Sequence, residues 1–128
     1  MLKWFLIAAG GAVGSLMRYS LQGWIQSLTI SLFPWGTFAV NLTACLAIGF
    51  LSGMFGGSSL IREEYRVGLT VGVLGGYSTF STFGLETFNL AKDKEFALAG
   101  MNLLLSCGVG VLAVWAGYRV AEYWFGVT

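Results

Sequence analysis

The stretch GVLGGYSTFSTFGLE, residues 72–86, combines glycines, hydroxyl side chains and phenylalanines within a strongly apolar part of the chain. A helix that only crosses a membrane has no need for this density of hydroxyls. They belong to Ser78, Thr79, Ser81 and Thr82. Backbone that leaves the helical conformation at membrane depth is found only inside protein or beside a water-filled cavity. The stretch therefore predicts a site within the membrane, with a helix break near the Gly75–Gly76 pair.

The composition is that of a membrane protein. Charged residues make up only 10% of the 128 residues and the mean hydropathy is +0.76, whereas a soluble domain carries about 25% charged residues. Four apolar stretches approach the roughly 20 residues that a spanning helix needs. They cover residues 4–25, 35–55, 65–90 and 96–124. We expect an all-α membrane protein with a single four-span domain over residues 1–128, without a soluble appendage or a cleaved signal peptide.

Glycines recur at four-residue spacing in three of these stretches. The runs are Gly10 and Gly14; Gly49, Gly53 and Gly57; and Gly68, Gly72 and Gly76. Lipid gives no hydrophobic drive between helices, so small residues let backbones approach and pack. The first two runs predict close helix contacts, and the third leads into the expected break. Because four spans enclose little interior, a pathway is easier to build from two or more copies.

The Lys and Arg residues are nearly balanced between the two ends of the predicted bundle. Four of them fall on the side that holds both termini, and three fall on the other. The first group is Lys3, Arg62, Arg66 and Arg119, and the second is Arg18, Lys92 and Lys94. Orientation follows the Lys/Arg bias of short connections, so this count predicts insertion in both orientations and antiparallel pairing. The net charge of +1 offers no basic patch for nucleic acid.

For three polar residues at membrane depth, the sequence allows two interpretations each. Arg18 is either an interfacial side chain that reaches headgroups or a charge that attracts an anion to a vestibule. Asn41 either makes an interhelical hydrogen bond or offers its two N–H donors to an anion. Glu86, the acidic residue clearly within a span, is either a satisfied carboxylate at a helix end or a functional group.

The fourth span and the two phenylalanines of the quoted stretch add further candidates. Asn102, Ser106 and Gly110 form a narrow polar or small stripe, although Ser106 could simply bond a carbonyl one turn earlier. Phe80 and Phe83 are either packing residues or donors of positive ring edges to a small anion. Ring edges and hydroxyls can coordinate an anion without a fixed charge that would hold it too tightly.

Cysteine and histidine content argues against metal or redox chemistry. Cys45 and Cys107 both fall within predicted spans. We interpret them as small apolar packing residues rather than as a disulfide or metal pair, since a thiolate site needs more ligands and a wetter setting. The chain has no histidine, which removes the commonest proton shuttle. No nucleophile–base pair appears in the sequence, so an enzyme is not expected.

Taken together, these motifs resemble the Fluc (CrcB) family of fluoride channels along essentially the whole chain. The first span reads GGAVGSLMRY, the second reads WGTFAVN, and the third carries the quoted stretch, in the family's order. The resemblance implies passive fluoride export through a dual-topology, antiparallel homodimer in the plasma (inner) membrane of a prokaryote. It also implies a third helix that is broken near its middle, with a structural sodium ion held there by backbone carbonyls of Gly75 and Ser78.

The resemblance also assigns roles to the candidate residues. The family's pore phenylalanines match Phe80 and Phe83, its pore asparagine matches Asn41, and its vestibule arginine matches Arg18. The family also has a row of hydroxyl side chains beside these rings, which we call the polar track. Its positions match Ser81 and Thr82 of the third span and Ser106 of the fourth. The family's acidic residue after the motif matches Glu86.

The fourth span departs from the family pattern at two positions. Asn102, which we also place on the fluoride pathway, stands where relatives often have a larger polar or aromatic residue. Gly110 stands where relatives can have a serine, so the polar track is expected to lack one hydroxyl. Two other classes share the general plan. A small proton-coupled multidrug transporter needs a glutamate in the first span, which here holds Arg18 instead, and an accessory subunit would carry no ion flux.

Overall fold

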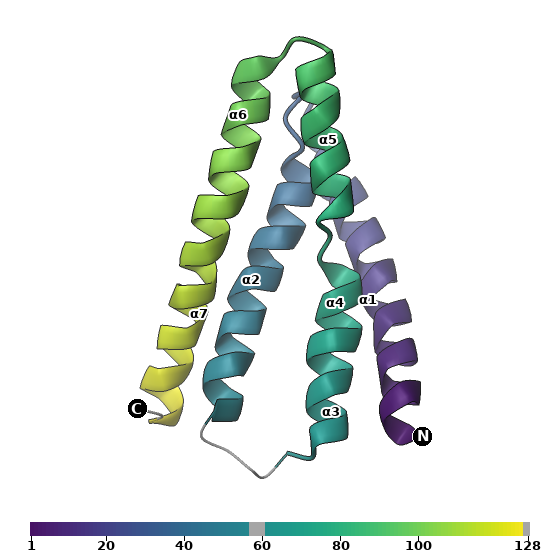
Figure 1. Ribbon diagram of the computed structural model, residues 1–128, viewed down its shortest axis with the longest axis vertical. Coiled ribbons are helices and arrows are strands. Elements are labelled where there is room, and N and C mark those ends of the chain that lie inside the picture. Colours follow the sequence, from purple (N-terminus) through teal and green to yellow (C-terminus); the bar gives the residue numbers. More distant parts are fainter. Residues whose placement is uncertain (57–60, 127–128) are drawn as a thin grey trace.

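The computed structural model describes residues 1–56 and 61–126, and its regular elements over these ranges are all helices (Figure 1). Within these two ranges, four helical columns are built from nine helical segments. They are α1 (Leu2–Ser27), α2 (Trp35–Gly56), α3 (Glu63–Val67), η1 (Gly68–Val73), α4 (Leu74–Tyr77), α5 (Ser81–Lys92), α6 (Phe96–Leu104), η2 (Leu105–Val109) and α7 (Gly110–Phe125). Each column coincides within a few residues with one predicted span.

The columns run up and down, so both termini lie at one end of the bundle and the connections 28–34 and 93–95 lie at the other (Figure 1). An exposed ion pair between Lys3 and Glu63, 3.2 Å long, joins the start of α1 to the start of α3. Among the described residues, two columns are long and apolar enough to cross a membrane on their own, at 35–56 and 96–125. The other two columns contain more polar residues or are interrupted.

The helices pair through their glycines. α1 lies against η1 and α4, and a Cβ added at Gly14 would collide with the Val73 carbonyl oxygen and come within 2.9 Å of the Tyr77 nitrogen. The contact is reciprocal: a Cβ added at Gly76 of α4 would lie 2.6 Å from the Gly11 carbonyl oxygen of α1. The first and third glycine runs therefore face each other across one interface.

The second helix pair is α2 with α7. An added Cβ at Gly49 would collide with the Val114 carbonyl oxygen and lie 2.9 Å from the Val114 Cα, while Gly117 of α7 meets Leu46 of α2 in the same way. Gly53 continues the contact at Ala121. The second run thus packs helices closely as expected. The last member of the run, Gly57, lies outside the described residues.

Little apolar side-chain volume is buried within one chain. Val40, Ala44 and Tyr77 form a small central cluster, with Leu21 packed against it. Large apolar side chains such as Leu16, Leu104 and Trp115 instead point outward along the columns, each more than 60% exposed. Outward apolar side chains are what a membrane environment requires of a helix bundle, because lipid is as apolar as the side chains themselves.

Two π-helical turns, η1 and η2, interrupt the regular helices of the third and fourth columns. Single π turns are frequent near functional sites, because the extra residue re-aims the side chains that follow it. The turn η2 holds Ser106 and Cys107. Hydropathy does not distinguish such a turn from an α-helix, so the sequence did not predict it.

Helical conformation stops in the middle of the third column. α4 ends at Tyr77, Ser78 is extended with φ −80° and ψ 157°, and α5 begins at Ser81. Figure 1 shows this short non-helical segment between α4 and α5 at about the middle of the bundle. It lies within the stretch 72–86 and positions the site described next.

Candidate functional site

Asn41 of α2 holds the non-helical segment in place. Its Nδ2 donates to the Thr79 carbonyl oxygen at 2.8 Å, and its Oδ1 accepts from the Thr79 N–H at 2.8 Å. Both backbone groups of Thr79 are thereby satisfied where a helix would otherwise satisfy them. The interhelical hydrogen bond is therefore present, and one of the two Nδ2 hydrogens remains available for a further acceptor.

Replacing Asn41 with alanine is expected to destabilise the protein, because it leaves the Thr79 N–H and carbonyl without partners. Each unsatisfied buried backbone group costs about 1–3 kcal/mol. Thermal unfolding in detergent measures the change, with Asn89→Ala as the control, since Asn89 is an exposed asparagine in α5. An Asn41→Ala protein as stable as the Asn89→Ala protein would contradict the role of this clamp.

The break withdraws the usual helical donors from carbonyl oxygens that include those of Gly75 and Ser78. In a continuous helix the Thr79 N–H would bond the Gly75 carbonyl and the Thr82 N–H would bond the Ser78 carbonyl. Here the Thr79 N–H donates to Asn41, and the Thr82 N–H donates to the Thr79 hydroxyl at 3.2 Å. Gly75 and Ser78 both line a small cavity of about 170 Å³ between α2 and the third column. Hard cations prefer such oxygen ligands.

A second cavity, of about 230 Å³, lies on the side of the break that faces the fourth column, and we call it the central cavity. Its lining comes from α2, the break, α5 and η2. The lining residues are Asn41, Cys45, Ser78, Thr79, Phe80, Phe83, Ser106 and Cys107. Polar side chains and aromatic rings predicted from three separate stretches thus meet in one place. None of the eight lining residues carries a fixed charge.

Phe80 and Phe83 differ in their surroundings although both line the central cavity. Their ring centroids are 5.6 Å apart and the planes are tilted by 52°. Phe83 is 6% exposed, whereas Phe80 is 81% exposed and projects away from its own chain. A tilted pair presents ring edges, which carry partial positive charge. Phe83 forms part of the cavity wall, and the Phe80 ring is free to contact something outside the chain.

Asn102 lies behind the central cavity rather than on its surface. It is 1% exposed, and its Nδ2 donates to the Thr87 hydroxyl at 2.8 Å. Ser106 donates its hydroxyl hydrogen to Asn102 Oδ1 at 3.1 Å, and Thr87 in turn donates to the Phe83 carbonyl at 2.8 Å. This chain of bonds connects the cavity hydroxyl of Ser106 to the helix that carries Phe83. Ser106 bonds a side chain one turn earlier, not a backbone carbonyl.

Ser81 and Thr82, at the start of α5, are not among the residues that line the central cavity. Ser81 is exposed and its hydroxyl lies 3.5 Å from that of Thr79. The Thr82 backbone is bonded to the Thr79 hydroxyl, which supports the first turn of α5. Both hydroxyls lie next to Phe80 in sequence, on the rim of the break.

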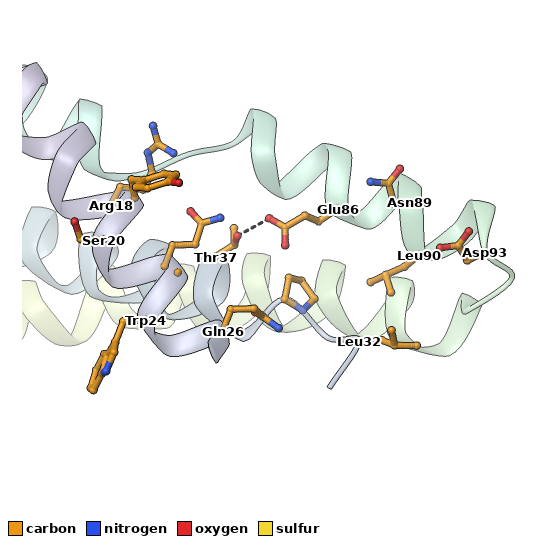
Figure 2. A pocket seen from close by; sticks show the side chains of 14 residues that line it. Arg18, Ser20, Trp24, Gln26, Leu32, Thr37, Glu86, Asn89, Leu90 and Asp93 are labelled. Atoms are coloured by element: carbon orange, nitrogen blue, oxygen red, sulfur yellow. Dashed lines mark hydrogen bonds between the residues drawn. The ribbon is translucent and has the colours of Figure 1, made fainter. Parts of the chain in front are cut away.

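A larger cavity, about 710 Å³, opens toward the end of the bundle that carries connections 28–34 and 93–95 (Figure 2). Arg18 lies at its inner end, where Nε donates to the Gly76 carbonyl oxygen at 3.2 Å. Arg18 lies nine positions before the end of α1 at Ser27, which corresponds to about 13 Å along a helix. Arg18 therefore belongs to the lining of the cavity and does not lie at the helix end.

Glu86 and Thr37 form a pair across this large cavity. The Thr37 hydroxyl donates to the Glu86 carboxyl, and Figure 2 shows the two side chains pointing toward each other. Thr37 is 3% exposed, so the hydrogen bond joins α2 to α5 in a largely buried position. Glu86 lies in the middle of α5, so it is not a carboxylate at a helix end.

Thr37, Cys45 and Cys107 are among the residues at these cavities that were not predicted from the sequence. Thr37 occurs in the motif of the second span, but its contact with Glu86 joins residues 49 positions apart. Cys45 and Cys107 were interpreted as packing residues, and they share the central cavity. No local pattern signals these neighbours, because each relation depends on how two helices are rotated against each other.

Comparison with known proteins finds relatives over most of the chain. A family model described as "CrcB-like protein, Camphor Resistance (CrcB)" matches residues 5–118. A protein of Geobacter sulfurreducens named "Fluoride-specific ion channel FluC" is 44% identical over 116 residues, which cover 91% of this chain and 94% of that protein. Proteins with the same name from Geotalea daltonii and Geobacter metallireducens are 44% and 42% identical, over 88% and 96% of this chain and 91% and 99% of their own lengths. The motifs around the helix break and the extent of these matches together show that the chain belongs to the CrcB family.

Proposed function

We propose that this chain is a subunit of a fluoride-selective channel that lets fluoride leave the cytoplasm passively. The observation that carries the proposal is the central cavity, where Asn41, Phe80, Phe83 and Ser106 meet without a fixed charge. The names of the relatives support the choice of ion. A neutral set of donors suits conduction, because binding must be strong enough for entry and weak enough for exit.

Fluoride is small and strongly hydrated, so several close donors must replace its water. Asn41 has one Nδ2 hydrogen left after its bond to Thr79. Rotation of the Ser106 hydroxyl away from Asn102 supplies a second donor. When no fluoride ion is present, the hydroxyl donates to Asn102 Oδ1 instead. The edges of Phe80 and Phe83 complete the set. Ser81 and Thr82 extend the donors beyond the rim toward the large cavity.

Arg18 raises the local fluoride concentration in the large cavity, which serves as a vestibule. A cationic side chain within low-dielectric walls focuses the field on approaching anions. The Thr37–Glu86 pair lies in the same cavity. The hydrogen bond from Thr37 keeps the Glu86 carboxyl directed at α2 and so limits its repulsion of the anion.

We also propose that a sodium ion binds at the break through the carbonyl oxygens of Gly75 and Ser78. Two observations support the fit: both carbonyls lose their helical donors to Asn41 and Thr79, and both residues line the 170 Å³ cavity. The ion would neutralise these carbonyl dipoles and stiffen the break. Thermal unfolding in sodium salts and in N-methylglucamine salts would then differ, and equal stabilities would count against the ion.

The proposal further includes an antiparallel homodimer of subunits inserted in both orientations. The exposed Phe80 ring and the small buried core support a partner, and the balanced Lys and Arg count supports dual insertion. A single cysteine placed near one terminus should react with impermeant maleimide from both faces of intact cells. Labelling from one face only would contradict dual insertion.

The experiment that tests the function is fluoride efflux from liposomes that contain only the purified protein. A fluoride electrode records release, and a chloride electrode on matched liposomes gives the selectivity control. Fast fluoride release with little chloride release is expected. Failure of a well-folded protein to release fluoride would remove the channel function and leave a coupled transporter or an accessory subunit.

A small multidrug-type transporter is not favoured. That class needs an acidic residue in its first span, and α1 contains Arg18 and no Asp or Glu. The relatives are named as channels, which also fits the expectation that the chain is not an enzyme.

A further inference from the structure

Two thiols from different helices line the central cavity. Cys45 belongs to α2, and Cys107 belongs to the π turn η2. Both are free, with Cys45 partly buried and Cys107 exposed. They are 62 positions apart in the sequence, and the shared cavity of about 230 Å³ confines both side chains to one small region.

The direction of the Cys45 side chain supports this proximity. A Cβ added at Gly110 would lie 3.5 Å from Cys45 Sγ, so this sulfur points at the fourth column. Gly110 follows η2 directly, and Cys107 lies three residues earlier in that column. The Cys45 sulfur therefore points at the column that carries Cys107, at a residue three positions after it.

The π turn explains why Cys107 reaches the cavity together with its neighbour Ser106. A π turn holds more residues than an α-helical turn, so the angle between successive side chains is smaller. Both neighbours can then face one cavity, as the lining shows. Asn41, Thr79 and Ser106 add polar groups to a wall that is otherwise mostly apolar.

Two thiolates suit one class of ligand. Thiolate is a soft ligand that selects Cu(I) and similar d¹⁰ cations, which accept two sulfurs in a nearly linear arrangement. A structural zinc site needs four ligands, and among the described residues no cluster of three or more His, Cys, Asp or Glu side chains could hold a metal. We propose that Cys45 and Cys107 form a two-thiolate site for a soft monovalent cation, with Ag⁺ as the accessible probe.

Binding would change the charge of the cavity. Each thiol releases one proton to water as its sulfur bonds the metal, so two protons leave for each cation bound. Two thiolates and one monovalent cation leave a net charge of −1. In the cavity through which we propose that fluoride passes, this charge would repel the anion. The consequence for flux rests on the proposed function, whereas the metal site itself does not.

The first test is Ag⁺ binding to the purified protein in chloride-free nitrate buffer. Native mass spectrometry should show one Ag⁺ per chain, with two protons released per ion in an unbuffered titration. Cys45→Ser and Cys107→Ser should each weaken binding at least 100-fold. Alkylation of Cys107 in the folded wild-type protein should abolish tight binding, and this measurement does not depend on the folding of a variant.

The matched control is the double variant Cys107→Ser, Gly108→Cys. It keeps two thiols but moves one of them by a single position, to an exposed residue where an added Cβ meets nothing within 4 Å. Its affinity should fall to that of the single variants. Tight Ag⁺ binding by this control, or by either serine variant, would overturn the paired site.

Fluoride efflux provides the second readout. Ag⁺ should stop efflux from wild-type liposomes, whereas the Cys107→Ser protein should keep the efflux rate that it shows before Ag⁺ is added, each protein being compared with itself. Absence of efflux before Ag⁺ is added would contradict the proposed function and leave the binding result intact. Efflux that continues with Ag⁺ bound would overturn the placement of the metal site on the fluoride pathway.

Discussion

Replacing Phe83 with isoleucine is expected to reduce fluoride efflux at least tenfold per folded protein, and Phe80→Ile is expected to do the same. Isoleucine keeps much of the bulk but has no ring edge with partial positive charge. A tenfold loss corresponds to about 1.4 kcal/mol of added barrier.

The two variants separate conduction from stability. Phe80 is 81% exposed, so its replacement removes little packing within the chain, whereas Phe83 is 6% exposed and its replacement also disturbs the core. Flux is therefore compared per folded protein after size-exclusion chromatography. Phe88→Ile is the control, since Phe88 is an exposed phenylalanine of the same helix α5. Normal efflux from both the Phe80 and the Phe83 variants would remove the rings from the mechanism.

Replacing Gly49 with alanine is expected to lower the free energy of unfolding more than the same replacement at Gly14, Gly76 or Gly117. The new Cβ would collide with the Val114 carbonyl oxygen and lie 2.9 Å from the Val114 Cα, so backbone rather than a side chain must move. Overpacking of this kind costs about 1–3 kcal/mol and occasionally more. Separation of α2 from α7 would also displace η2 and the wall of the central cavity.

The control for Gly49→Ala is Gly100→Ala in α6. An added Cβ at Gly100 meets nothing within 4 Å, and alanine in a helix is favoured over glycine by about 0.5–1 kcal/mol. Thermal unfolding in detergent should therefore place the Gly49 variant below the wild-type protein and the Gly100 variant at or above it. Similar midpoints for the two variants would contradict the close backbone contact between α2 and α7.

Much of the fold could be predicted because membrane insertion depends on local composition. Four apolar stretches predicted four helical columns within a few residues, since about 20 apolar residues suffice to cross a bilayer. The glycine runs predicted close contacts for the same local reason, although not which run meets which. The partners became known only from the structure, where Gly14 meets Val73 and Gly49 meets Val114.

The candidate site was predicted in part. Asn41, Phe80, Phe83 and Ser106 were all named from the sequence, and the structure brings them to one cavity. Asn102 was named with them but lies behind the cavity wall, and Thr37 was recognised only through its hydrogen bond to Glu86. Whether a polar side chain faces a cavity or supports its wall depends on helix rotation, which the pattern of residue types does not reveal.

The sequence by itself determined the helical class, the four columns, the family and the position of the site in the stretch 72–86. Only the tertiary structure decided how the break is held by Asn41, which carbonyls it releases and which thiols share a cavity. The physical reason is the separation along the sequence over which each interaction acts. Hydropathy and glycine spacing act over one or two helical turns, whereas the contacts of Asn41 with Thr79 and of Thr37 with Glu86 join residues 38 and 49 positions apart.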